Sequence, residues 1–209
     1  MKIAIIKYPA GNVQSVCFAL ERLGITAKIT DDAETIQTTD KVIFPGVGEA
    51  RSAMKDLHQK GLDRLIPMLK QPVLGICLGL HLLCQHSEEN DTNCLGIFDL
   101  AVKKFQASVE KPDKIPQIGW NTINQFKGSL FEGIPEDSYQ YFVHSYYAPL
   151  GVHTVAQAEY TLTYSAALQK DNFYAVQFHP EKSAEIGQQI LENFIQLKNP
   201  KQTWTSSQP

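Results

Sequence analysis

A short stretch at residues 73–83 constrains the fold of this chain more than any other. It consists of an apolar run at residues 73–76, then Cys77 between Gly75 and Gly79, then a helical pattern of apolar residues. An apolar run of this length is typical of a buried strand in a parallel sheet. The glycines remove side chains that would clash where the strand ends and the helix begins. The spacing Gly-x-Cys-x-Gly therefore predicts a nucleophile elbow with Cys77 at its tip.

Cys77 also has an ordinary interpretation as a core residue, because cysteine is among the residue types most often buried. On this stretch alone the two interpretations are about equally good. A second motif at residues 177–181, Gln-Phe-His-Pro-Glu, favours the nucleophile. A thiolate nucleophile needs a base within reach and a third group that orients the base. His179 follows a strand-like run and Glu181 lies two positions on, so we predict a catalytic triad of Cys77, His179 and Glu181.

Strand-like and helical stretches alternate along the first half of the chain, joined by short loops that contain glycine. We expect strands at residues 2–7, 25–29, 41–44 and 73–76. This alternation predicts an α/β fold, a doubly wound, mostly parallel sheet with helices on both faces. In such sheets ligands bind outside the carboxyl ends of the strands. The loop at residues 45–48 and Cys77 both follow strands, so one site can use both.

The pattern changes after residue 95. Short runs rich in aromatic and β-branched residues predict an antiparallel portion added to the parallel sheet: residues 100–105, 120–123, 139–143, 152–158, 166–168 and 173–178. An amphipathic helix is expected over residues 183–198. We expect residues 1–200 to form a single domain and residues 201–209 to form a frayed polar tail.

The bulk properties of the chain exclude several classes of protein. A length of 209 residues with 43% hydrophobic and 20% charged residues is typical of one globular domain. A net charge of −3 disfavours nucleic-acid binding, and no apolar run reaches membrane-spanning length. The four cysteines show no Cys-x-x-Cys pairing and no histidine at zinc-ligand spacing. We therefore expect no disulfide framework, metal or cofactor, and the cytoplasm as the compartment.

The elbow at residues 75–79 together with the motif at residues 177–181 resembles the triad-type (class I) glutamine amidotransferases. Three further stretches are similar to the glutaminase subunits of imidazole glycerol phosphate synthases: residues 119–121, 141–146 and 181–183. The likeness extends from about residue 3 to about residue 197. It implies that Cys77 attacks the side-chain amide of L-glutamine, that His179 transfers protons and that Glu181 orients His179.

The resemblance also implies an oxyanion hole made by two backbone N–H groups, one from Leu78 and one from Val47. The glycines on either side of Val47, Gly46 and Gly48, allow a peptide flip, so the hypothesis follows that the hole assembles only when a partner signals. The alternative is a plain strand-to-helix loop at residues 45–48, which has about one chance in three from the sequence alone.

The family's substrate-binding positions correspond to six residues of this chain: Gly46, Gly48, His81, Glu89, Ser145 and Tyr146. Glu89 is expected in the helix after the elbow, and its alternative is a solvated charge beside Glu88. His81 departs from the family, which commonly has glutamine four residues after the nucleophile. An imidazole in one orientation donates or accepts one hydrogen bond at that nitrogen, whereas an amide does both.

Ammonia released from glutamine needs an acceptor site, and the resemblance implies a separate one. The partner would be a (β/α)8-barrel cyclase that makes imidazole glycerol phosphate in histidine biosynthesis, in a heterodimer with this chain. Trp120, Asn121 and Lys182 are expected where ammonia passes between the subunits. Exposed aromatic residues are also common on ordinary surfaces, which is the alternative for Trp120.

Three other functions remain open at this point. The first is a subunit of the same fold that feeds ammonia to another synthase, for example one that amidates a sugar. The second is a stand-alone cysteine hydrolase acting on γ-glutamyl substrates, which would turn over without a partner. The third is a binding protein with a vestigial site, and the complete set of Cys77, His179 and Glu181 argues against it.

Overall fold

The computed structural model of the chain describes residues 1–9, 13–107 and 113–198, so the tail expected at residues 201–209 lies outside the described residues. A seven-stranded sheet forms the centre, with strand order β11-β12-β13-β4-β3-β1-β2. Its five parallel strands are β1 (Ile3–Ile6), β2 (Lys28–Thr30), β3 (Lys41–Gly46), β4 (Val73–Cys77) and β13 (Phe173–Val176). Strands β11 (Thr154–Glu159) and β12 (Thr163–Lys170) extend it antiparallel beyond β13.

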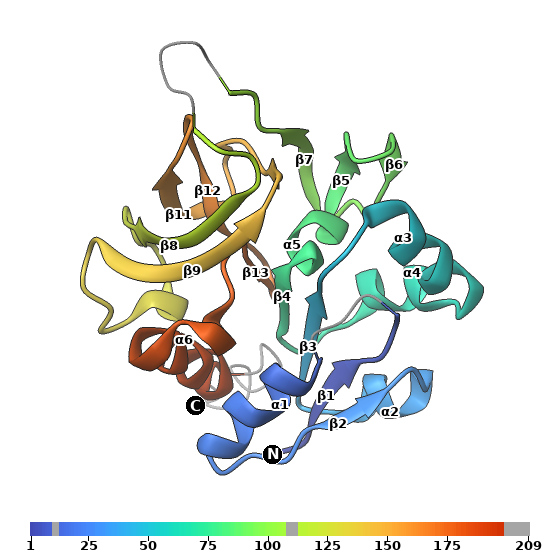
Figure 1. Cartoon of the computed structure of the whole chain (residues 1–209). Helices are drawn as coiled ribbons and strands as arrows, with labels where there is room; N and C mark the ends of the chain where they lie inside the picture. The colour runs from blue at the N-terminus through green and yellow to red at the C-terminus, as the bar shows by residue number, and fades with distance from the viewer. Residues whose placement is uncertain (10–12, 108–112, 199–209) are drawn as a thin grey trace, which may run out of the picture.

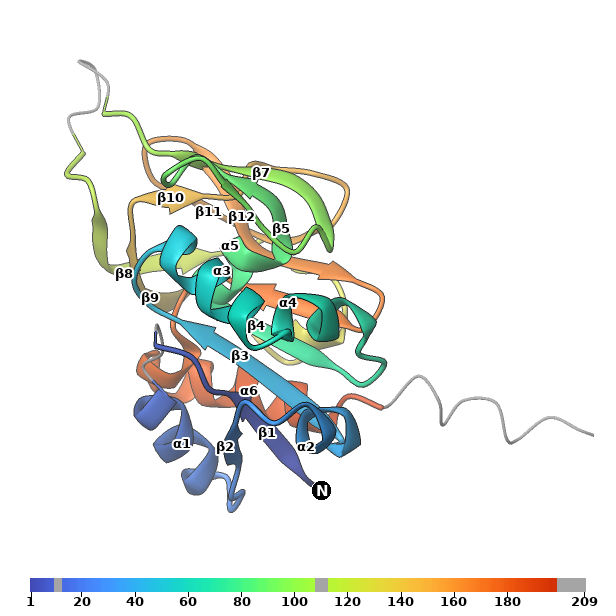
Figure 2. The ribbon, with the colours of Figure 1, turned by 90° about the vertical axis from the view of Figure 1, so that its right-hand side faces the viewer.

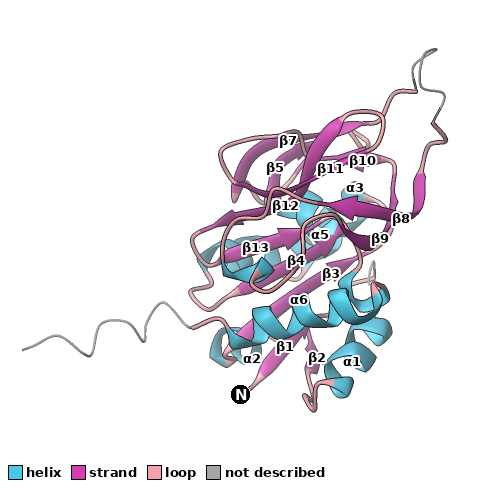
Figure 3. Cartoon of the chain, turned by 90° about the vertical axis from the view of Figure 1, so that its left-hand side faces the viewer, coloured by secondary structure: helices cyan, strands magenta, loops and turns pink. Residues whose placement is uncertain are grey.

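Helices cover both faces of this sheet (Figure 1). One face packs against α1 (Val13–Arg22) and α6 (Ala184–Gln196), which lie in front of the sheet in Figure 3. The other face packs against α2 (Ala33–Thr38), α3 (Ala50–Gln59), α4 (Leu62–Leu65) and α5 (Leu78–Leu83), seen from the opposite side in Figure 2. The predicted fold class, doubly wound and mostly parallel with an antiparallel addition, is confirmed.

Alternation along the strands divides the core in two. In β1, Ile3 and Ile5 point into the core beneath α1 and α6, whereas Ala4 and Ile6 point into the core beneath the other helices. All four residues are buried. Successive side chains of a strand point to opposite faces, so a strand covered on both faces is apolar at every position. This is why the parallel strands appear in the sequence as continuous apolar runs.

Two smaller sheets stand beside the central one. A four-stranded sheet has the order β10-β7-β5-β6 and consists of β10 (Tyr146–Tyr147), β7 (Phe98–Lys104), β5 (Cys84–Ser87) and β6 (Thr92–Asn93). A two-stranded antiparallel sheet pairs β8 (Gln117–Ile123) with β9 (Ser138–His144). Short 3₁₀ turns are η1 (Ile66–Met68), η2 (Ser129–Phe131) and η3 (Pro180–Lys182).

The second strand differs from the predicted one, which covered residues 25–29, because β2 begins only at Lys28. The backbone N–H of Ile25 donates to the Leu20 carbonyl, so this segment still closes the end of α1. Gly24 has φ +74°, the left-handed conformation that often ends a helix. Hydrogen bonds of the helix end therefore hold the first residues that the apolar pattern had assigned to the strand.

Candidate active site

Cys77 is both the last residue of β4 and the residue before α5. Its backbone has φ 54° and ψ −107°, a strained conformation for a residue with a side chain. The flanking glycines explain how the turn is possible. A Cβ on Gly79 would lie 2.0 Å from the Phe44 carbonyl oxygen, and one on Gly75 would lie 2.7 Å from Leu83 Cδ1. The chain therefore makes a sharp strand-to-helix turn with the cysteine at its tip, the geometry of a nucleophile elbow.

Three strands bring the parts of the site to one edge of the sheet. In the register of β3 and β4, Gly46 lies beside Cys77, and Val176 of β13 lies beside Ile76 on the other side. The strands run parallel, so the loop after β3, the elbow after β4 and the segment after β13 leave the sheet at the same edge. His179 belongs to that last segment, directly before η3.

His179 and Glu181 form a buried pair. Nδ1 of His179 lies 2.8 Å from Oε1 of Glu181, and the exposed fractions of the two residues are 2% and 8%. Their backbone is also held in place. The His179 N–H donates to the Tyr141 carbonyl, and the Ser183 hydroxyl donates to the His179 carbonyl at 2.7 Å. Because Nδ1 is occupied by Glu181, the other ring nitrogen is free to face the nucleophile.

Cys77 and His179 line the same cavity, and Glu181 contacts the His179 ring, so the three predicted triad residues converge in space. Burial by itself lowers the pKa of His179. The hydrogen bonds and charges of Cys77 and Glu181 outweigh burial and raise that pKa to about 10. A raised pKa means that the imidazolium form of His179 is favoured at neutral pH. The arrangement can attack a carbonyl carbon and protonate a leaving amine.

A cavity of about 310 Å³ opens beside the sulfur. Its volume is in the range of small-molecule sites, roughly 300 to 1,000 Å³. Five of the six predicted substrate-binding residues line it: Gly48, His81, Glu89, Ser145 and Tyr146. Five residues predicted for catalysis, the oxyanion hole or the ammonia passage share its wall: Cys77, His179, Val47, Leu78 and Lys182. Sequence reasoning missed Pro116, Val143 and His144, which also line the cavity. Val143 and His144 lie within the stretch 141–146 that resembles the family, so the signal was present.

Gly46 is the exception among the predicted binding residues, because it does not line this cavity. A Cβ on Gly46 would lie 2.2 Å from the Tyr8 hydroxyl and 2.9 Å from the Leu78 Cβ. The Tyr8 hydroxyl donates to the Pro45 carbonyl at 2.7 Å. Gly46 therefore leaves room for a buried tyrosine beneath the loop, and its place in the site is one of packing.

The position of Glu89 differs from the prediction, since Glu89 lies in the turn between β5 and β6 and not in a helix. Helix α5 ends at Leu83 because the carbonyls at its end accept hydrogen bonds from N–H groups outside the helix. The N–H groups of residues 95–97 donate to the carbonyls of residues 82–84, which begins the smaller sheet in place of a longer helix. The half-buried Glu89 still reaches the cavity, and its Oε2 accepts from the Ala50 N–H at 2.8 Å. Burial raises its pKa, as does the charge of Glu49, while the Ala50 N–H opposes them.

His81 lines the cavity and is hydrogen-bonded to a neighbouring side chain. Its Nε2 lies 2.8 Å from Gln177 Oε1. Burial lowers the pKa of His81 to about 4, against the opposing effects of the Gln177 side chain and the Tyr146 backbone, so the ring is neutral at pH 7. The same Gln177 amide reaches the nucleophile, with Nε2 4.0 Å from Cys77 Sγ.

Trp120 and Asn121 lie on β8, outside the cavity. Trp120 is 53% exposed and packs edge-on against Tyr141, with ring centroids 5.9 Å apart. Asn121 donates from Nδ2 to the Glu159 carbonyl at 2.7 Å. Of the three residues predicted at the ammonia passage, Lys182 alone borders the cavity, and the other two belong to the neighbouring surface.

Among the described residues, no group of three or more His, Cys, Asp or Glu side chains has the arrangement of a metal site. All four cysteines are free thiols. In the described ranges no helix has the length and apolarity that crossing a membrane requires.

Comparisons with known proteins indicate the same class of chemistry as the geometry of the site. The family model described as glutamine amidotransferase class-I matches residues 5–197. The imidazole glycerol phosphate synthase subunit HisH of Bacteroides fragilis strain YCH46 is 55% identical over 197 residues, covering 94% of this chain and all of the relative. The subunit HisH of Shewanella loihica is 45% identical over 203 residues, covering 92% of this chain and 89% of the relative.

Solved structures show the same fold at lower identity. A putative GMP synthase subunit from Thermoplasma acidophilum superposes with a TM-score of 0.69 and 21% identity, covering 93% of this chain and 92% of that one. A structure described as a glutamine amidotransferase superposes with a TM-score of 0.68 and 19% identity, covering 91% and 98%. With the elbow, the buried His–Glu pair and a family match that covers nearly the whole chain, the chain belongs to the class-I glutamine amidotransferase family, within the branch of the HisH subunits of imidazole glycerol phosphate synthase.

Proposed function

We propose that this chain is the glutaminase subunit of an imidazole glycerol phosphate synthase. It hydrolyses L-glutamine to L-glutamate and ammonia and passes the ammonia to a cyclase subunit in histidine biosynthesis. The convergence of Cys77, His179 and Glu181 beside a cavity carries the proposal, in a chain 55% identical to a HisH subunit over nearly its whole length. Residues 1–200 would act as one domain, and the cytoplasm would be the compartment.

The reaction starts with attack of the Cys77 sulfur on the side-chain amide carbon of glutamine. The His179 imidazolium gives its proton to the departing nitrogen, so that ammonia leaves and a glutamyl thioester remains on Cys77. His179, now neutral, takes a proton from a water that attacks the thioester. Glutamate leaves, and the proton on His179 restores the starting state. Glu181 holds the ring through Nδ1 in both halves of the reaction.

The tetrahedral intermediates carry an oxyanion, for which we propose the backbone N–H groups of Leu78 and Val47. Both residues line the cavity beside Cys77. Loss of one such donor costs about 100-fold to 1,000-fold in rate. Gly48, with φ +108°, supports a peptide that can rotate, so the Val47 N–H would turn toward the sulfur when the partner is engaged.

The charges around the cavity suggest how glutamine is held. Glu89 supplies a carboxylate in the cavity wall, which would bind the α-ammonium group of the amino acid. Ser145 and Tyr146 border the same cavity and would contact the rest of the amino-acid backbone. Specificity for glutamine would then come from charge at one end of the substrate and from the triad at the other.

The proposed docking surface for the cyclase is the exposed face of the β8–β9 sheet. Trp120 and Tyr141 are paired across the two strands, as are Ile118 and Val143, so the four side chains lie on one face. Trp120 is 53% exposed and Ile118 62% exposed, an apolar area of the kind that marks a protein interface. The same sheet leads into the cavity wall at Ser145, so a (β/α)8-barrel partner seated here would lie next to the ammonia source.

Mixing the chain with its cyclase subunit tests the proposal. We expect glutamate formation to rise when the partner and its nucleotide substrate are added, and Cys77→Ala to reduce the rate by at least about 1,000-fold. Unchanged turnover with the partner would favour a stand-alone γ-glutamyl hydrolase. Stimulation by a sugar-amidating synthase in place of the cyclase would favour the alternative function, a subunit of the same fold that feeds ammonia to that synthase. Activity that survives in Cys77→Ala would exclude the mechanism.

A further inference from the structure

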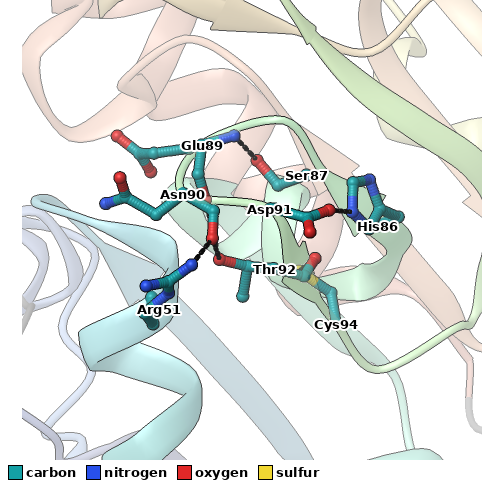
Figure 4. A network of polar contacts seen from close by, with 8 residues as sticks. All are labelled: Arg51, His86, Ser87, Glu89, Asn90, Asp91, Thr92 and Cys94. Carbon is teal, nitrogen blue, oxygen red and sulfur yellow. Dashed lines mark hydrogen bonds and ion pairs between the residues drawn. The ribbon is translucent and has the colours of Figure 1, made fainter.

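The turn between β5 and β6, residues 88–91, lies against the first turn of α3 and makes three polar contacts with it, of which Figure 4 shows the one between Arg51 and Asn90. The Ala50 N–H donates to Glu89 Oε2 at 2.8 Å. Nδ2 of Asn90 donates to Glu49 Oε1 at 2.7 Å, and the Arg51 guanidinium donates to the Asn90 carbonyl. Two segments about 40 residues apart in the chain are therefore joined at successive residues, Glu49, Ala50 and Arg51.

Glu49 contacts the turn through Asn90 and also caps the helix that the turn lies against. It is the N-cap of α3, and its carboxylate accepts from the Arg51 N–H at 2.8 Å and from the Ser52 N–H at 2.9 Å. Burial alone would raise the pKa of Glu49. The Asn90 amide and the backbone N–H groups of Ser52 and Arg51 outweigh burial and lower the pKa to about 2. Asn90 thus holds a carboxylate that is ionised at neutral pH and that already defines where α3 begins.

The contact between the turn and α3 begins directly after the loop that borders Cys77. Val47 and Gly48 line the cavity, and Glu49 is the next residue. At its other end the loop is anchored by the Tyr8 hydroxyl, which donates to the Pro45 carbonyl. Only residues 46–48 lie between the two anchors, and two of them are glycines. The direction of the Val47 N–H therefore depends on how firmly each end is held.

The turn itself is firmly built. Asn90 and Asp91 both have positive φ values, 54° and 47°. The Thr92 hydroxyl donates to the Glu89 carbonyl at 2.7 Å, and the Glu89 N–H donates to the Ser87 hydroxyl. Asp91 points to the other side, where its Oδ1 lies 2.9 Å from His86 Nε2 (Figure 4). Asn90 thus contacts α3, whereas its neighbour Asp91, with a similar backbone conformation, makes its side-chain contact within the hairpin.

We propose that the turn at residues 88–91 is a brace that holds the Val47–Gly48 loop in place through the first turn of α3, with Asn90 and Arg51 as positioning residues. The inference rests on the proposed function, because it gives the loop its part in the oxyanion hole. Glu89 belongs both to the cavity wall and to the brace, because it lines the cavity and accepts a hydrogen bond from the Ala50 N–H. The wall that would receive the substrate ammonium is thereby the same element that steadies the oxyanion loop.

The experiment compares Asn90→Gly with Asp91→Gly in the complex of this chain with the cyclase. Glycine accepts positive φ at either position, so each substitution preserves the turn, and only the first removes the contact with Glu49. We expect Asn90→Gly to lower kcat for glutamine hydrolysis about tenfold, with KM for glutamine within about threefold. Asp91→Gly should leave both constants within about twofold of the unaltered complex.

A second readout separates the oxyanion loop from the nucleophile. Iodoacetamide alkylates Cys77 by direct displacement of iodide by the sulfur, so no oxyanion forms and the loop has no part in that reaction. We expect the alkylation rate of Asn90→Gly to equal that of the unaltered complex. Arg51→Met should lower kcat as Asn90→Gly does, and Arg51→Lys, which keeps a donor for the Asn90 carbonyl, should recover part of the loss.

Two outcomes would overturn the brace. One is a kcat for Asn90→Gly equal to that of Asp91→Gly. The other is an alkylation rate that falls in parallel with kcat, which would mean that the nucleophile itself had been disturbed. If the unaltered complex failed to hydrolyse glutamine, the proposed function would fall and the brace with it. Activity in the unaltered complex together with either of the first two outcomes would remove the brace alone.

Discussion

At the scale of single residues, His179 shows how neighbours decide protonation. Burial acts against the charged ring, and this effect alone would leave the imidazole neutral at pH 7. Contacts with Cys77 and Glu181 reverse the outcome and raise the pKa to about 10. The proton is therefore held until the pH rises through that value, well above the ordinary histidine pKa of about 6.5. The sequence predicted the three residues, but only their contacts and burial decide which form the ring takes.

His81 leads to a prediction about activity. A glutamine at this position can donate to Gln177 Oε1 from its own amide, so we expect His81→Gln to retain activity within about tenfold. The control is His81→Leu, which would leave the buried Gln177 amide without its partner and should lose more. Steady-state kinetics of both variants provide the measurement. Complete loss in His81→Gln would assign His81 a dedicated role in the reaction.

At the scale of elements, the close approach of α5 to β3 depends on one glycine, Gly79. The Cβ that Gly79→Ala introduces would lie 2.0 Å from the Phe44 carbonyl oxygen, a backbone atom of β3. Because neither backbone can yield without moving the sheet, we expect a loss of about 3 kcal/mol in the free energy of unfolding. Urea denaturation of the variant measures the loss.

The matched control for that experiment is Gly151→Ala. Its Cβ would approach only the Leu100 side chain, with Cδ2 nearest at 2.9 Å, and the end of a leucine side chain can rotate away. We expect a change below about 1 kcal/mol. Equal losses in Gly79→Ala and Gly151→Ala would show that the contact between α5 and β3 is looser than the structure indicates.

The end of α5 shows where element prediction from sequence reached its limit. The resemblance to the family placed Glu89 in the helix that follows Cys77. The observed helix has six residues, because the carbonyls of residues 82–84 bond to the N–H groups of residues 95–97. That pairing depends on a segment more than ten residues away, and local periodicity carries no information about it. Glu89 reaches the cavity nevertheless, from a turn.

At the scale of the whole molecule, two buried histidines make stability depend on pH. Burial lowers the pKa of His81 to about 4. Burial, and secondarily the charges of His81 and His179, lower that of His144 to about 3, against the Tyr146 carbonyl. In the unfolded chain both take a proton near pH 6.5, so the unfolded state binds more protons below that pH. The free energy of unfolding should therefore fall between pH 6.5 and pH 4.5, by about 1 kcal/mol per pH unit for each histidine.

Denaturation at pH 7 and at pH 5 checks this sign, and His81→Gln should show a smaller loss than the unaltered chain. His179 acts in the opposite direction, and only in the part of this range above pH 6.5. Its folded pKa is raised, so its contribution is fully present below pH 6.5 and is lost as the pH rises from there toward 10. A free energy of unfolding that stays constant from pH 7 to pH 5 would contradict the buried, neutral state of the two rings.

Assembly is the second property at this scale. Trp120 is the largest exposed side chain on the β8–β9 face, and large aromatic residues dominate the binding energy of interfaces. We expect Trp120→Ala to weaken binding to the cyclase by at least about tenfold and to leave the thermal unfolding temperature nearly unchanged. Val152→Ala, at a residue 96% exposed on another part of the surface, is the control. Titration calorimetry measures both, and equal affinities would remove this face as the docking surface.

The sequence by itself determined the parallel sheet and the elbow of this protein, and it predicted the three residues proposed as the triad. These features depend on local patterns: continuous apolar runs, glycines beside Cys77, and a histidine and a glutamate two positions apart after a strand. Tertiary structure alone decided the place of Glu89, the pairing of His81 with Gln177 and the contact of Asn90 with Glu49. Each of these depends on segments distant in the chain meeting in space, which a pattern of neighbouring residues does not encode.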